Sequence, residues 1–113
     1  MKPIIVENSR VPKMLSLVIK IGAITLWPFV FVRGKADERL IRHESIHIAQ
    51  YNELFVIGFL ALYHYDWLKG LIKYRDKEKA YYRIRFEQEA YMYDSVDGYL
   101  ENRSKYEWRK YNV

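Results

Sequence analysis

Apolar and polar residues recur with a helical period from residue 37 onward. One broad apolar stripe repeats every three to four positions and comprises Leu40, Ile41, Ile46, Ile48, Ala49 and Leu54. Asp37 is a favourable N-cap, and Glu38 places negative charge at the positive end of the helix dipole. No proline follows before the end of the chain. The pattern predicts an uninterrupted helix over residues 37–65.

The region before this helix is mostly apolar. Residues 14–32 carry one charge, Lys20, and approach the length of a membrane span, but a lysine near the middle of a span is costly. β-Branched and aromatic residues fill positions 23–32, which is typical of a strand. We therefore expect a short helix over residues 9–21 and then a strand or hairpin ending at Gly34. Pro28 restricts the strand to a sheet edge or a bulge, and an edge strand beside the helix would suit an extended peptide.

A second helical segment is expected after a charged, loop-like run over residues 73–79. Residues 95–113 should extend or follow that segment and either pack against it or cover a cleft; the packing candidates are Tyr99, Leu100, Tyr106 and Trp108. The predicted fold is α+β, mainly α, with one or two short N-terminal strands followed by two long helices that carry a zincin-like metal site. At 113 residues the chain should form a single domain, residues 1–113.

Candidate chemistry lies within the first helix, where His43, Glu44 and His47 form an H-E-x-x-H motif. Positions i and i+4 share one face of a helix, so both imidazoles can reach one metal ion. Glu44 is then placed to take a proton from a water molecule at the metal. The chain has only three histidines, and two of them fall at this spacing.

A catalytic zinc ion needs a third protein ligand, and the chain has no cysteine to supply it. Glu53 is rejected because Gln50 stands where metzincins have the glycine that turns the chain back. His64 is rejected because it lies about 25 Å from His47 on a continuous helix. The second helical segment offers Glu87 and Glu89, which are two residues apart and face different directions, so only one of them can serve.

The combination of H-E-x-x-H with Glu87-Gln88-Glu89-Ala90 resembles the gluzincin metallopeptidases, in which E-x-x-A follows on a second helix. Small bacterial or phage proteins with H-E-x-I-H and F-E-x-E-A-Y motifs look similar. The resemblance implies Zn²⁺ held by His43, His47 and Glu87, with Glu44 as the general base in peptide-bond hydrolysis. Tyr91 departs from this pattern because it replaces an aspartate that supports a ligand histidine. Asp94, one helical turn later, is an imperfect substitute.

Charge and composition narrow the partners of the protein. The net charge is +5 and the basic residues are spread along the chain without a nucleic-acid motif, so we expect a peptide or protein substrate and no nucleic acid. The N-terminus lacks the features of a signal peptide and the chain lacks cysteine, which favours a cytoplasmic protein. Peripheral membrane association through surfaces near Trp27 and Trp67 stays open. Two other functions remain: a zinc-binding module without catalysis, and a small membrane-surface or assembly protein whose motif is accidental.

Overall fold

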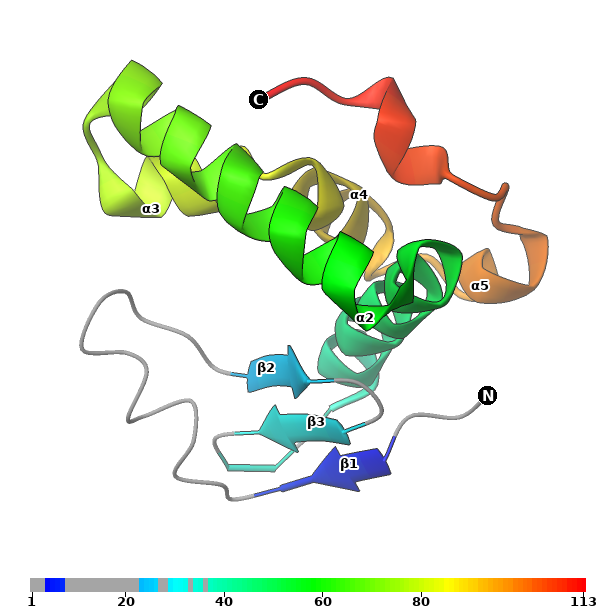
Figure 1. Ribbon diagram of the computed structural model, residues 1–113. Coiled ribbons are helices and arrows are strands. Elements are labelled where there is room, and N and C mark those ends of the chain that lie inside the picture. The colour runs from blue at the N-terminus through cyan, green and yellow to red at the C-terminus, as the bar shows by residue number, and fades with distance from the viewer. Residues whose placement is uncertain (1–3, 8–22, 27–28, 33, 36) are drawn as a thin grey trace.

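A computed structural model describes residues 4–7, 23–26, 29–32, 34–35 and 37–113. The predicted fold class is confirmed, since the described chain is α+β and mainly helical (Figure 1). Short strands come first and the long helix α2 follows them. The described elements are β1 (Ile4–Val6), β2 (Ala23–Leu26), β3 (Phe29–Val32), α2 (Glu38–Tyr74), α3 (Lys77–Tyr82), α4 (Arg85–Tyr93), α5 (Tyr99–Asn102) and the 3-10 helix η1 (Glu107–Lys110).

The strands form one sheet in the order β1-β3-β2, in which β3 runs antiparallel to β2 and parallel to β1. The predicted hairpin is therefore confirmed. The predicted edge position is confirmed for β2, but the strand directly before the motif helix, β3, is central because β1 pairs along its other side. Pro28 and the helix expected over residues 9–21 lie outside the described residues.

The sheet fixes the first half of α2 through one face of β3. Val30 and Val32 are both 1% exposed and cluster with Ile48 of α2, as the two-residue period of a strand requires when one face is covered. The motif residues lie on the same part of α2 as Ile48, so this contact anchors the helix that carries them.

Helix α2 begins as expected and ends later than expected. The Asp37 carboxylate accepts a hydrogen bond from the Leu40 backbone N–H at 2.7 Å, which caps the N-terminus. The helix ends at Tyr74, where Arg75 adopts the left-handed conformation and its N–H bonds to Leu71. The loop predicted over residues 73–79 is wrong in most of its length, because these residues close α2 and start α3.

The prediction of an uninterrupted helix is wrong at Phe55, whose φ of 59° and ψ of 168° are not helical. Figure 1 shows the resulting change in direction within α2. Aromatic packing across the turn stabilises it: the Tyr51 and Phe59 rings stack at 3.8 Å, and Phe59 stacks on Phe86 of α4 at 4.5 Å. Phe55 itself is 82% exposed. The turn thus lets the second half of α2 pack beside α4.

The second helical segment is shorter than predicted, since α4 has nine residues. The C-terminal segment runs past the second half of α2 in Figure 1. Trp108 is buried and its ring contacts Phe86 at 5.0 Å, as the packing prediction requires. Leu100 and Tyr106 are exposed, so they contribute less to the core than expected.

Candidate metal centre

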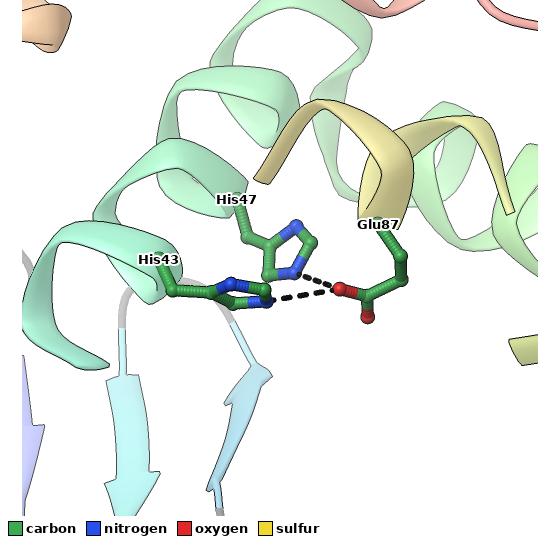
Figure 2. A group of neighbouring side chains, drawn as sticks. All are labelled: His43, His47 and Glu87. Atoms are coloured by element: carbon green, nitrogen blue, oxygen red, sulfur yellow. Dashed lines mark hydrogen bonds and ion pairs between the residues drawn. The ribbon is translucent and has the colours of Figure 1, made fainter. Parts of the chain in front are cut away.

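Three side chains that lie far apart in the sequence meet between α2 and α4. Among the residues that the structure describes, His43, His47 and Glu87 form the one group that could hold a metal ion, with one ligand atom from each within 4.8 Å of the others. Glu87 Oε1 lies 3.0 Å from His43 Nε2 and 2.9 Å from His47 Nε2 (Figure 2). Two ligands of one tetrahedral zinc ion are about 3.3 Å apart, so the group needs only a small expansion to hold one.

The ring of His43 is oriented by Asp94. Asp94 Oδ2 lies 3.0 Å from His43 Nδ1, and its side chain is buried. A carboxylate that accepts the Nδ1 proton leaves the Nε2 lone pair free for a metal. Asp94 therefore contacts His43 directly, although its sequence position predicts only an imperfect substitute for the aspartate that the resemblance implies at residue 91. Tyr91, which replaces that aspartate in sequence, packs its ring against His43 at 4.4 Å.

The ring of His47 is oriented by Gln50 from the next turn of α2. Gln50 Oε1 lies 2.7 Å from His47 Nδ1, while Gln50 Nε2 donates to the Phe86 carbonyl at 3.1 Å and to Glu89 at 3.0 Å. These acceptors determine the orientation of the amide, so its oxygen must face the histidine. Gln50 is fully buried, so solvent does not compete for these hydrogen bonds.

Glu87 presents a single oxygen to the two histidines. Its other oxygen, Oε2, accepts a hydrogen bond from the Tyr63 hydroxyl at 2.6 Å. Burial, and then the negative charge of Glu87, raise the pKa of Tyr63 well above its usual value, so the phenol stays protonated and donates. Tyr63 lies beyond the turn at Phe55 and reaches the site because of that turn.

The group of three attracts positive charge. Burial by itself lowers the pKa of His47, but the charge of Glu87 and its hydrogen bond outweigh burial and raise the pKa to about 9. Burial likewise raises the pKa of Glu87, yet the charges and hydrogen bonds of His47 and His43 bring the net value well below its ordinary range. A proton or a metal cation between these side chains satisfies the same electrostatic demand.

Glu44 is buried next to the candidate ligands, at 5% exposure. Its negative charge contributes to the raised pKa values of His47 and Tyr63, so its carboxylate acts on the same small volume. The candidate ligand atoms come from the other three residues, and Glu44 lies beside them without belonging to that group.

The side chains rejected as ligands have other partners. His64 is exposed, and its Nδ1 bonds to the Leu60 carbonyl at 2.7 Å. Glu53 accepts two hydrogen bonds from Arg103, and Glu89 faces the same arginine. Of the acidic pair left open by helix periodicity, Glu87 is the member that meets the histidines.

Two contributors were not identifiable from the sequence. Tyr63 is one of eleven tyrosines, and only the turn at Phe55 directs it to Glu87. Arg103 lies in a segment whose position was undecided, and it forms ion pairs with Glu53 and Glu89. The roles of Tyr63 and Arg103 follow only from contacts between elements that are distant in the sequence.

The site is closed in this structure. His43, Glu44, His47 and Glu87 are each between 3% and 5% exposed. The arrangement can hold a cation, orient both imidazoles and keep a carboxylate beside them. Comparison of the chain with models of protein families, with curated proteins and with solved structures finds no match. The functional argument therefore depends on the geometry of the site.

Proposed function

We propose that the protein binds one zinc ion through His43, His47 and Glu87. The observation that carries this proposal is that all four ring nitrogens of the two histidines face acceptor oxygens. Both Nδ1 atoms face Asp94 or Gln50, and both Nε2 atoms face Glu87 Oε1. A neutral imidazole has one N–H, so a cation at the Nε2 side completes the set. Two imidazoles and a carboxylate are a usual donor set for zinc.

The reaction that this site supports best is hydrolysis of a peptide bond. When bound, zinc lowers the pKa of a water molecule and polarises a carbonyl group. Glu44 would then serve as the general base that takes a proton from the attacking water and returns it to the leaving amine. Tyr63 is engaged by Glu87, so the hydrogen-bonded hydroxyls of Tyr81 and Tyr91, 2.9 Å apart, are the candidates that stabilise the oxyanion.

A zinc-binding module without catalysis is the second candidate, and the burial of the site favours it. Peptide substrates reach the metal only if the side chains around the ligands move, because those ligands are at most 5% exposed. The two functions share the metal and differ in turnover.

Metal content is the first test. Wild-type protein purified without chelator should hold one zinc ion per chain, and His43→Ala should lose it. His64→Ala is the matched control, since this exposed histidine lies outside the site. A metal content near zero in wild-type protein, or equal zinc in wild type and His43→Ala, would refute the site.

Catalysis is tested with Glu44→Gln, which keeps the shape of the side chain and removes the base. The variant should retain zinc and lose cleavage of an unstructured protein substrate such as casein. If wild type and Glu44→Gln both bind zinc and cleave equally little, the module without catalysis is correct.

Peripheral membrane association of a cytoplasmic protein is a separate proposal, favoured by the outer face of α2. Of the described helices, α2 alone is long and apolar enough to span a membrane by length and composition, with 33% of its most apolar window buried. Four exposed apolar residues fall on one face of its second half: Ile57, Tyr65, Leu68 and Ile72. Lys69 lies beside them and could meet anionic headgroups.

Vesicle sedimentation tests this association. Wild-type protein should pellet with vesicles that contain phosphatidylserine, and Leu68→Glu should stay in solution with its fold intact. Equal amounts of both proteins in the pellet would argue against docking through this face. A wild-type protein that never pellets would remove the membrane proposal.

A further inference from the structure

Glu89 is a buried carboxylate that the proposed metal site leaves unused. It is 0% exposed and lies two residues after Glu87 on α4. Its oxygens accept hydrogen bonds from Gln50 at 3.0 Å, from the Tyr99 hydroxyl at 2.7 Å and from Arg103. A buried charge with this many partners is fixed in position.

Arg103 holds Glu89 from the opposite side. Its guanidinium donates to Glu89 Oε2 at 2.5 Å and to Glu89 Oε1 at 3.0 Å, and it binds both oxygens of Glu53 at 3.1 and 2.9 Å. The arginine side chain is only 6% exposed. One planar guanidinium thus joins α2, α4 and the segment that follows α5, which a lysine cannot do with one ammonium group.

Gln50 connects this ion cluster to the proposed metal ligand. Its Nε2 donates to Glu89 and to the Phe86 carbonyl, and this leaves Oε1 to accept from His47 Nδ1 at 2.7 Å. If Glu89 moved, the amide would lose one of the two acceptors that fix its orientation. The Nε2 atom of His47 is aimed at Glu87 only while the ring is held in this way.

We infer that Arg103 is a positioning residue for His47, acting through Glu89 and Gln50. The sequence of contacts Arg103–Glu89–Gln50–His47 is named the relay. The inference rests on the proposed zinc site, because it assigns the relay the task of presenting His47 to the metal. The segment after α5 then belongs to the site as a support, and removing it would weaken metal binding.

A double-mutant cycle separates this role from a general loss of stability. Arg103→Lys should lower zinc affinity about tenfold and Gln50→Leu about 10- to 100-fold, the range for groups that support metal ligands. Because both act on His47 through the same contacts, the double variant should bind zinc about as weakly as Gln50→Leu alone. Affinity is measured by competition with a chromophoric chelator.

Arg85→Lys is the matched control. Arg85 forms a part-buried ion pair with Asp66 through two hydrogen bonds of 2.9 Å, and that pair makes no described contact with His47. The control should lower the denaturation midpoint and leave zinc affinity unchanged. Additive losses in the double variant, an equal loss of affinity in Arg85→Lys, or wild-type affinity in Arg103→Lys would each overturn the inference.

Two further measurements keep the test decisive. If Arg103→Lys does not fold, Tyr99→Phe removes one hydrogen bond to Glu89 and should still lower zinc affinity severalfold; no change would count against the relay. If wild type binds no zinc, the proposed function fails, and ¹⁵N NMR of the His47 ring tests the relay alone. The Nδ1 proton should exchange faster with solvent in Tyr99→Phe than in wild type, and equal exchange rates would refute the relay.

Discussion

Asp94 provides the sharpest test of how the proposed ligands are oriented, because it holds His43 from outside the ligand set. Its carboxylate is buried, with the residue 2% exposed, and lies 3.0 Å from His43 Nδ1. Asp94→Asn keeps an acceptor oxygen and removes the charge, so we expect zinc affinity to fall about tenfold, or about 1.4 kcal/mol. Asp94→Ala removes the acceptor and should cost about 100-fold, near 2.7 kcal/mol.

The folded state should tolerate the asparagine variant. The other side-chain partner joined to Asp94 by an ion pair is Arg39, whose side chain is 62% exposed, and such pairs contribute about 0–1 kcal/mol. Asp97→Asn is the control, because Asp97 has a 93% exposed side chain and pairs with Arg42. The assay is competition with a chelator at buffered pH, together with a urea denaturation curve for each protein. If Asp94→Asn and Asp97→Asn bind zinc within twofold of wild type, Asp94 does not orient His43 and the reasoning is refuted.

Three other predictions concern stability. Phe55→Gly should raise the free energy of unfolding by about 1 kcal/mol, because glycine accepts a positive φ without strain and the 82% exposed ring contributes little packing. The control Ile57→Gly should lower the free energy of unfolding. A loss of stability of Phe55→Gly in urea denaturation would contradict the strained backbone conformation at residue 55. Gly70→Ala should lower the free energy of unfolding by about 1–3 kcal/mol despite the better helix propensity of alanine, since the added Cβ would lie 3.0 Å from Ala80. An unchanged urea denaturation midpoint would disprove this close contact between α2 and α3. The stability of zinc-free protein should decline as pH rises from about 6.5 through 9, because the pKa of His47 is raised in the folded state and the stabilising proton is lost in that range. His47→Gln should flatten this part of the plot of stability against pH. A flat plot for wild-type protein would contradict the raised pKa of His47.

Local patterns predicted the parts of the fold that depend on neighbouring residues. The N-cap at Asp37, the hairpin of β2 and β3 and the shared face of His43 and His47 all follow from periodicity and capping. The turn at Phe55 did not follow, because phenylalanine has no preference for a positive φ. That turn depends on the stacked rings of Tyr51, Phe59 and Phe86, which come from both sides of it and from another helix.

The residues of the candidate site were likewise predicted only in part from the sequence. The motif identified His43, Glu44 and His47, and a family resemblance selected Glu87 from the acidic pair. The residues that hydrogen-bond to these side chains were predicted only in part from the sequence. Asp94 was judged an imperfect substitute, yet it lies within hydrogen-bond distance of His43. The contact is possible because α4 ends at Tyr93 and places the Asp94 side chain beside the first turns of α2.

The sequence by itself determined the available donor groups: two imidazoles and a carboxylate at helical spacing, and no cysteine anywhere in the chain. Helix periodicity left both Glu87 and Glu89 open as the third ligand, and only the tertiary structure shows which side chains hold each of them. Glu87 and Glu89 are equivalent as isolated residues of one helix. They differ because α4 packs on α2 with Glu87 toward the histidines and Glu89 toward Arg103. Residues two apart on a helix face different directions, and the packing of that helix assigns each direction its partner.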